Sequence, residues 1–325
     1  MLSWLELMGK FLVRRLLQAI PTLLLVSILI FSIIHLAPGG PMAMYALAPN
    51  VDQAELDRIE ERLGLSDPLP IQYVKWLSSY ITGDWGLSYK FGRSVWDIVS
   101  ARIGPTLLLV GTSLLIALFI SIPFGIFSAL YRNRSVQYVA NSVAMLGVSI
   151  PTFWLGMLVL LVFSVRIRII PTGGMISIGS SVTNIPDLAA HLLAPALVLS
   201  TLYIAAWSRY TRSSMLEVMG QDYVRTARAK GFTETVVIFR HALKNALLPM
   251  VTLVGLQAGA LVGGAMITEV VFAWPGMGRL MAESLAGRDY PVLMGSFMLM
   301  SVFVIIGNLA SDIMYAFVDP RIRLE

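Results

Sequence analysis

Cysteine is absent from this sequence of 325 residues. Its absence excludes disulfide scaffolds, thiolate metal sites, cysteine nucleophiles and CxxC redox pairs. Histidine is scarce as well, because His35, His191 and His241 lie far apart and form no HExxH pair. The sequence also lacks a GxxxxGK(S/T) phosphate-binding loop. We therefore expect no cofactor or metal bound to this chain and no ATP site of its own.

Charged residues are few: they make up 13% of the chain, whereas 57% of the residues are hydrophobic. The mean hydropathy is +0.76. In a typical soluble domain about a quarter of the residues are charged. The composition therefore predicts a membrane protein and excludes a soluble enzyme. The formal net charge of +5 is explained better by basic cytoplasmic loops than by a nucleic-acid-binding surface.

Six apolar runs predict six transmembrane helices, because crossing about 30 Å of hydrocarbon takes about 20 helical residues. The runs cover residues 16–36, 106–130, 139–165, 188–207, 247–271 and 292–317. The fourth run is the weakest, since Pro195 and polar residues interrupt it. The first run is too long for a signal peptide, and no small-x-small cleavage site follows it. The predicted fold class is an all-α membrane protein.

Lysine and arginine in the short loops predict the orientation, because these residues accumulate on the cytoplasmic side. They concentrate before the first run, between the second and third, between the fourth and fifth, and in the tail. Both termini are then cytoplasmic, which requires an even number of spans. The predicted parts are a flank and first span (1–36), an extracytoplasmic loop domain (37–103), a transmembrane core (104–317) with a cytoplasmic loop (208–246), and a cytoplasmic tail (318–325).

The extracytoplasmic loop domain is predicted to be helical. Apolar spacing favours one helix over residues 53–65 and a second over 71–81, and the Gly-Asp-Trp-Gly sequence at 83–86 is typical of a turn. Elsewhere, Glu269 and Asp312 lie near the ends of spans. For these two carboxylates we expect exposure at the membrane interface rather than a role in a proton relay.

The fifth run contains a double GxxxG pattern formed by Gly255, Gly259 and Gly263, with the polar Gln257 at a similar depth. Glycines four residues apart lie on one helix face and let another helix approach closely. The pattern leaves two interpretations open, which are packing within the chain and packing against a partner subunit or around a solute path.

The cytoplasmic loop carries the most informative sequence, YVRTARAKGFT at residues 223–233. Its apolar residues alternate with basic ones in a helical pattern, and Gly231 supplies a stop where positive φ is cheap. A second helix is expected to run from there toward Pro249. The loop is thus predicted to be a helix–turn–helix whose basic residues could reach acidic groups on a partner. The apolar members are Val224, Ala227, Ala229 and Phe232, and the basic members are Arg225, Arg228 and Lys230.

This loop resembles the EAA-type coupling loop of binding-protein-dependent ABC importer permeases. The stretches YVRTARAKG at 223–231 and HALKNALLP at 241–249 look like the oligopeptide, dipeptide and nickel branch of that family, and specifically like its first, B-type permease. Arg225, Thr226 and Ala227 stand where the general motif has Glu-Ala-Ala. Further stretches that match the family lie at residues 36–41, 62–70, 83–88, 149–156, 267–276 and 288–291, so the resemblance covers nearly the whole chain.

The resemblance implies a permease subunit that forms a path for di- or oligopeptides across a prokaryotic plasma membrane. It implies four kinds of partner: a homologous second permease, two cytoplasmic ATPase subunits that hold ATP and magnesium, an extracytoplasmic solute-binding protein, and the peptide itself. The outer loop would help to receive the binding protein. The coupling residues would be Tyr223, Arg225, Ala227, Arg228, Ala229, Lys230, Gly231, Phe232 and Thr233.

Three alternatives stay open at this point. The same kind of importer could carry nickel or another small solute, because solute choice rests largely with the binding protein. An ion-driven secondary transporter would need more intramembrane charges and broken helices in repeated halves than the sequence offers. A membrane-embedded enzyme would need paired catalytic groups, and His35, His191 and Asp312 form no convincing set.

Overall fold

The computed structural model describes residues 2–42, 52–62, 64–130, 150–247, 250, 253–254 and 265–318. Within these residues the fold is helical, and the one β pairing is an isolated bridge between Leu87 and Ser94. Four helices contain segments long and apolar enough to cross a membrane, which confirms an all-helical protein with several apolar spans. They are α1 (Leu2–Leu36), α5 (Val95–Leu130), α8 (Ile185–Met219) and α16 (Tyr290–Val318). The predicted runs 139–165 and 247–271 lie partly outside the described residues, so the count of six stays a prediction.

Three of these helices extend well beyond the predicted runs, and α1 already begins at Leu2 rather than near residue 16. Helix α5 begins at Val95 rather than near residue 106, and α8 continues past Trp207 to Met219. Pro195, which weakens the fourth apolar run, lies inside α8 without ending the helix. Neighbouring helices can compensate for the backbone hydrogen bond that a proline removes, and Pro195 is buried in α8. The first part of the predicted 208–246 loop is therefore a helical extension.

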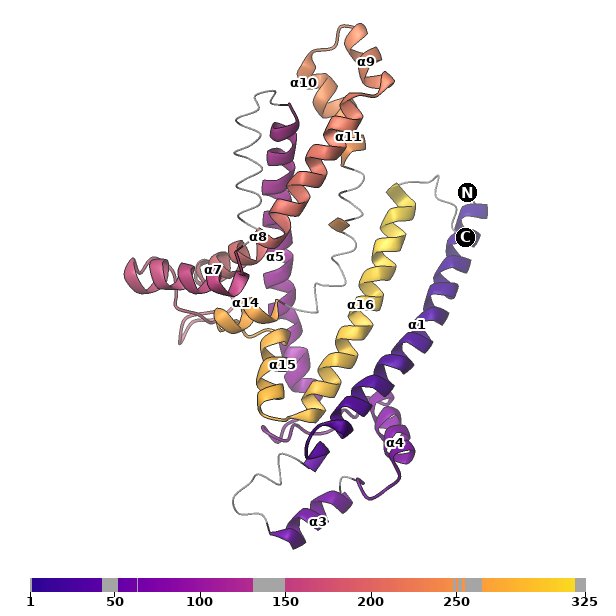
Figure 1. Ribbon diagram of the computed structural model, residues 1–325, viewed down its shortest axis with the longest axis vertical. Coiled ribbons are helices and arrows are strands. Elements are labelled where there is room, and N and C mark those ends of the chain that lie inside the picture. The colour runs from indigo at the N-terminus through magenta and orange to yellow at the C-terminus, as the bar shows by residue number, and fades with distance from the viewer. Residues whose placement is uncertain are drawn as a thin grey trace.

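The four long helices lead from one group of short helices to another, and α1 runs in the direction opposite to α5, α8 and α16 (Figure 1). The start of α1 and the ends of α5, α8 and α16 point toward the end that carries α9 (Asp222–Ala229), α10 (Glu234–Val236) and α11 (Leu243–Ala246). The opposite end carries α3 (Gln53–Arg62) and α4 (Leu69–Ile81). The helices predicted over residues 53–65 and 71–81 are thus present with slightly different bounds, and their extracytoplasmic location stays a prediction.

Helices α1 and α16 pack against each other in opposite directions (Figure 1). A salt bridge of 3.0 Å joins Arg15 to the partly exposed Asp312. Near the other end of α1, a buried cluster combines residues of α1 with residues of α15 (Met277–Ala286) and α16. Its members are Ile30, Phe31, Ile34, Met281, Tyr290, Leu293, Met294 and Met298. The first and last described helices of the chain therefore form one pair.

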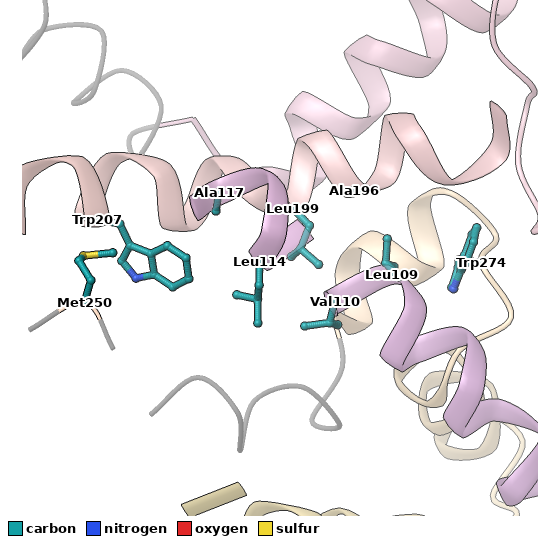
Figure 2. Close-up of a cluster of buried hydrophobic side chains, with 9 residues drawn as sticks. All are labelled: Leu109, Val110, Leu114, Ala117, Ala196, Leu199, Trp207, Met250 and Trp274. Carbon is teal, nitrogen blue, oxygen red and sulfur yellow. The ribbon is translucent and has the colours of Figure 1, made fainter. Parts of the chain in front are cut away.

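Helices α5 and α8 form the central contact (Figure 2). Leu109, Leu114 and Ala117 of α5 are buried with Ala196 and Leu199 of α8 in one cluster. Further along α5, Gly125 brings the two backbones together: a Cβ placed there would lie 2.5 Å from Thr211 Cβ and 2.8 Å from the Ser208 carbonyl oxygen. Only glycine permits this approach, since real Cβ atoms do not come so close to other heavy atoms.

Helix α4 is anchored on α1 by hydrogen bonds and aromatic contacts. The Ser27 and Tyr73 hydroxyls lie 2.8 Å apart, and His35 Nε2 lies 3.0 Å from Gln72 Oε1. The chain then turns at residues 83–86, as predicted, where Gly83 and Gly86 have φ of +91° and +75°. The turn stacks Trp85 on Tyr80, with ring centroids 4.4 Å apart. The outer segment is therefore fixed to the spans rather than free.

Two motifs that lie far apart in the sequence meet at the buried Asp289. Its carboxylate accepts a hydrogen bond of 2.5 Å from the Ser88 hydroxyl and one of 3.1 Å from the Tyr89 backbone N–H. Asp289 is fully buried and precedes α16 directly. The Gly-Asp-Trp-Gly-Leu-Ser stretch of the outer loop is thereby tied to the start of the last helix.

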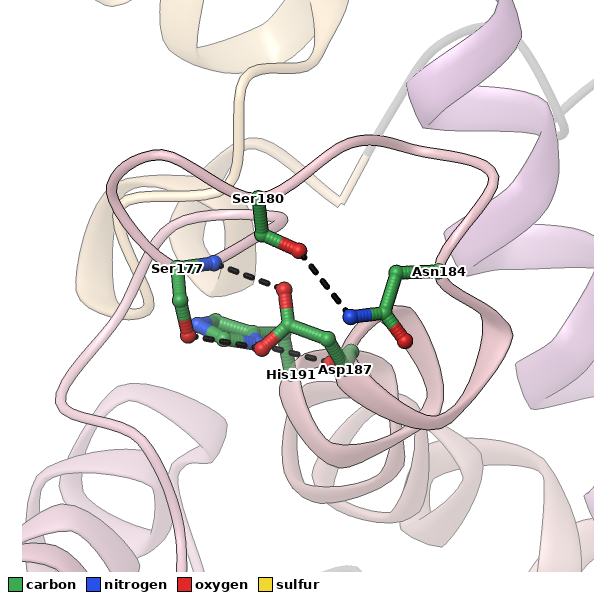
Figure 3. Close-up of polar contacts among 5 residues, drawn as sticks. All are labelled: Ser177, Ser180, Asn184, Asp187 and His191. Carbon is green, nitrogen blue, oxygen red and sulfur yellow. Dashed lines mark hydrogen bonds and ion pairs between the residues drawn. The ribbon is translucent and has the colours of Figure 1, made fainter.

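The loop between η2 (Leu160–Arg166), which follows α7 (Thr152–Val159), and α8 is held by polar contacts (Figure 3). Ser177 donates to the Asp187 carboxylate from its backbone N–H at 2.8 Å and from its hydroxyl at 2.6 Å. His191 Nδ1 lies 2.8 Å from the Asp187 carbonyl oxygen. The Asn184 amide donates to the Ser180 hydroxyl at 3.3 Å. The start of α8 and this loop therefore form one hydrogen-bonded unit.

Glu269, in α14 (Met266–Val271), is fully buried, so the expected interfacial exposure of this residue is wrong. Its carboxylate accepts hydrogen bonds from the Thr106 hydroxyl at 2.8 Å and from the Arg279 backbone N–H at 2.9 Å. The Thr106 hydroxyl in turn accepts from the Met277 N–H at 2.7 Å. A Cβ on Gly276 would overlap with the Glu269 carboxylate. Glu269 is therefore a structural link between α14, α5 and α15.

Replacing this link is expected to destabilise the protein. In Glu269→Ala the Thr106 hydroxyl and the Arg279 N–H lose their acceptor, and each buried unpaired donor costs about 1–3 kcal/mol. Thermal unfolding of the purified protein in detergent, followed by tryptophan fluorescence, measures the loss. The control is Glu283→Ala, which removes only a half-exposed partner of Arg279 and should cost less than about 1 kcal/mol. Equal melting temperatures for the two variants would contradict the structural role of Glu269.

Candidate functional site

The predicted helix–turn–helix is present at one end of the molecule. Helix α9 ends at Ala229, and the chain reverses at Gly231, whose φ of +79° lies in the left-handed region that favours glycine. After Thr233, helical structure resumes through α10, the π-helical segment η3 (Val237–Ala242) and α11. The described part of the second helix ends at Ala246, and Pro249 lies outside the described residues.

One face of residues 222–246 is packed against the long helices. Val224 and Ala227 of α9 are buried in one cluster with Ile126 of α5, Met215 of α8 and Val237. Ala229 and Phe232, which the helical pattern groups with them, are exposed. Ala229 lies about 200° around α9 from Ala227 and so on the opposite face, and Phe232 follows the end of the helix and no longer keeps its period. Helix α9 thus shares one buried cluster with residues of η3, α5 and α8.

Two of the three basic residues predicted to reach a partner are engaged inside the segment. Arg228 donates two hydrogen bonds across the turn to the Glu234 carboxylate, at 2.6 Å and 3.1 Å. Arg225 lies 3.5 Å from Asp222, both being exposed. Hydrogen bonding between Arg228 and Glu234 lowers the pKa of Glu234 below its ordinary value and raises the pKa of Arg228. The Arg228–Glu234 pair thus braces the turn.

Acid should weaken the ion pair between Arg228 and Glu234. The folded-state pKa of Glu234 is lowered, so the pair stabilises the turn above the ordinary carboxyl pKa and loses its effect as the pH falls through the folded-state value. Proteolysis within residues 221–247 should therefore accelerate below about pH 4. The change should be only a few-fold, because exposed ion pairs contribute about 1 kcal/mol at most. Glu234→Gln should show the faster rate already at pH 7, whereas Glu217→Gln, outside the turn, should not. Identical pH profiles for all three proteins would contradict the role of the pair.

A shallow pocket of about 280 Å³ opens on the surface of the segment. It is lined by Tyr223, Thr226, Ala227, Lys230, Phe232 and His241. The Tyr223 hydroxyl oxygen accepts a hydrogen bond of 2.9 Å from the Asn245 side-chain amide. The rings of Phe232 and His241 lie 5.5 Å apart. His241 and Asn245 had not been singled out as site residues, although both lie in the HALKNALLP stretch that carries the family resemblance.

The other predicted site residues, Gly255, Gln257, Gly259 and Gly263, lie outside the described residues. Both interpretations of the GxxxG pattern therefore stay predictions. Among the residues that the structure describes, no group of three or more histidine, cysteine or acidic side chains could hold a metal ion.

Comparisons with known proteins agree with the loop resemblance. A family model described as "binding-protein-dependent transport system inner membrane component" matches residues 121–324. A companion model for the N-terminal part of such membrane components matches residues 8–110. Together the two models cover almost the whole chain, including residues 222–246 and helices α3 and α4.

Relatives match over their full length. The oligopeptide transport system permease protein AppB of Bacillus subtilis (strain 168) is 44% identical over 317 residues, which is 97% of this chain and 100% of the relative. The glutathione transport system permease protein GsiC of Escherichia coli (strain K12) is 40% identical over 318 residues, which is 98% of this chain and 100% of that protein.

A solved structure shares the fold. It is a chain of the MetNI methionine ABC transporter in inward facing conformations, with a TM-score of 0.56 and 18% identity, and the match covers 68% of this chain and 96% of that chain. At this identity the likeness concerns the fold alone. The family models and the relatives carry the assignment: this chain belongs to the family of binding-protein-dependent transport system inner membrane components.

Proposed function

We propose that this chain is a transmembrane permease subunit of an ATP-binding-cassette importer for peptides. The observation that carries the proposal is the helix–turn–helix at residues 222–246, called the coupling segment from here on. One of its faces is buried against α5 and α8. Because one face of the segment is buried against α5 and α8 and the other face is exposed, a partner docked on the exposed face could transmit force to these helices. The chain has no phosphate-binding loop, so the energy would come from partner ATPases, which would hold ATP and magnesium.

The proposed assembly contains a homologous second permease, two cytoplasmic ATPase subunits and an extracytoplasmic solute-binding protein. We infer six spans with both termini in the cytoplasm of a prokaryotic cell. The shared direction of the start of α1 and the ends of α5, α8 and α16 supports this orientation (Figure 1), as does the concentration of lysine and arginine at that end. The anchored helices α3 and α4 would then face the binding protein.

Peptides are the proposed solute because the relatives named above are permeases for oligopeptides and for glutathione, itself a short peptide. Nickel or another small solute is the second candidate within the same class of importer. An ion-driven secondary transporter is the candidate from a different class, and it would work without ATPase partners.

The proposal is tested by affinity purification of the tagged chain in mild detergent, after co-expression with its genomic neighbours. The expected eluate contains a second permease, ATPase subunits and vanadate-sensitive ATP hydrolysis. Proteoliposomes with the added binding protein should then accumulate labelled peptides in an ATP-dependent manner. A chain that purifies alone, without ATP hydrolysis, would overturn the proposal and favour the secondary transporter. ATP-dependent uptake of nickel but not of peptides would change the solute alone.

A further inference from the structure

The pocket on the coupling segment is lined by hydrogen-bond donors. Three of its six lining residues, Tyr223, Lys230 and His241, can donate, and none of the six is a carboxylate. The hydroxyl proton of Thr226 is committed to the Asp222 carbonyl oxygen at 2.9 Å. Ala227 and Phe232 form apolar walls. A ligand of this pocket therefore has to supply acceptor atoms, and beside a lysine a negative charge is favoured.

Two of these donors are unused within the segment. The Tyr223 oxygen already accepts from Asn245, which leaves its proton free to be donated elsewhere. His241 Nε2 is buried and has no hydrogen-bond partner among the described residues. Buried polar atoms are seldom left unpaired in folded proteins, and such an atom calls for a partner.

The acidic residues of the segment do not supply that partner. Residues 221–247 contain five lysines and arginines but only two acidic residues, Asp222 and Glu234. Glu234 is held by Arg228 through two hydrogen bonds, and Asp222 lies against Arg225. Lys230 forms no ion pair among the described residues. The positive charge of Lys230 at the pocket is thus not neutralised by an acidic residue of the segment.

We propose that this pocket receives an aspartate or glutamate side chain of the ATPase subunit, which pairs with Lys230 and accepts hydrogen bonds from Tyr223 and His241. The proposal rests on the proposed function, because it needs an ATPase partner. The apolar walls would exclude water around the carboxylate and so strengthen the pairing. The charge relation places the cation on the permease and the anion on the ATPase.

The test uses the co-expressed complex and compares two charge reversals, Lys230→Glu and Lys244→Glu. Lys244 is exposed on the neighbouring helix and does not line the pocket. We expect Lys230→Glu to reduce the ATPase retained on the tagged permease about tenfold or more, since like charges across an interface are costly, whereas Lys244→Glu should retain it. Tyr223→Phe and His241→Phe each keep an aromatic ring at the position but remove its hydrogen-bond donor. Each should cause a smaller loss of retained ATPase. Gel filtration of each variant verifies that it is folded.

A compensating variant identifies the carboxylate. Exposed aspartates and glutamates of the ATPase subunit are changed to lysine one at a time, and one of these changes should restore retention to Lys230→Glu while weakening the wild type. Equal retention by Lys230→Glu and Lys244→Glu overturns the pocket and leaves the proposed function intact. Failure of every compensating change overturns the carboxylate pairing. Failure of the wild-type permease to retain any ATPase would overturn the proposed function itself.

Discussion

Gly231→Pro is expected to abolish ATP-driven uptake while leaving the chain inserted in the membrane. Gly231 has φ of +79°, whereas the proline ring holds φ near −65°. Its N–H also donates to the Arg228 carbonyl oxygen at 2.9 Å, and proline has no such proton. The turn between α9 and α10 can therefore not form, and the surface that α9 presents is lost.

A graded series separates backbone strain from other effects. A Cβ on Gly231 would meet nothing within 4 Å, so substitutions there are limited by the backbone alone. Gly231→Asn should keep nearly full uptake, since asparagine tolerates the left-handed region, and Gly231→Ala should cost roughly 1–2 kcal/mol in the turn. Uptake by reconstituted proteoliposomes and membrane insertion are measured for each variant. Normal uptake by Gly231→Pro would show that this turn has no part in coupling.

Gly125→Ala is expected to be the most damaging single methyl group that can be added to α5. Its Cβ would meet both a side chain and the backbone of α8, at Thr211 and Ser208, and the Ser208 carbonyl lies in a helix that cannot shift locally. The helices would have to move apart along their contact, with an expected loss of about 3 kcal/mol. Because the coupling segment is packed on these two helices, retention of the ATPase should fall as well.

The same helix provides a matched control in Gly111. A Cβ at Gly111 meets nothing within 4 Å, so Gly111→Ala should be neutral or stabilising by about 0.5–1 kcal/mol. The temperature at which half of the protein is lost from the gel-filtration peak after heating compares the two variants. If Gly125→Ala and Gly111→Ala are lost from the peak at the same temperature, the close approach of α5 and α8 does not limit stability.

Hydropathy located the described long helices but not their ends. An apolar run ends at the edge of the hydrocarbon layer, whereas a helix can continue into the aqueous phase as long as its backbone hydrogen bonds are satisfied. Helix α8 therefore reaches Met219, beyond the predicted end at 207, and α5 begins at Val95. In contrast, the turn at Gly231 was predictable because it rests on local backbone sterics that the sequence displays directly.

Contacts between distant segments were not predictable from periodicity. Glu269 was expected at the interface, yet its partner Thr106 lies on another helix, and nothing in the local sequence marks that contact. One signal for the burial of Glu269 was Gly276, because a Cβ there would overlap with the Glu269 carboxylate. Likewise, Arg228 looked available to a partner because its ion pair with Glu234 forms only after the chain has turned.

The pairing of α1 with α16 has a consequence for the way this protein is made. Helix α1 leaves the ribosome long before its neighbour α16, because the other described helices lie between them in the sequence. At translation rates of about 5–20 residues per second, α1 waits in the bilayer on the order of tens of seconds before α16 arrives. During that interval Ile30, Phe31 and Ile34 lack their neighbours from α15 and α16, and Arg15 has yet to meet Asp312. A chain that terminates before α16 leaves α1 without this neighbour, so the synthesis of α16 is the step that completes the pair.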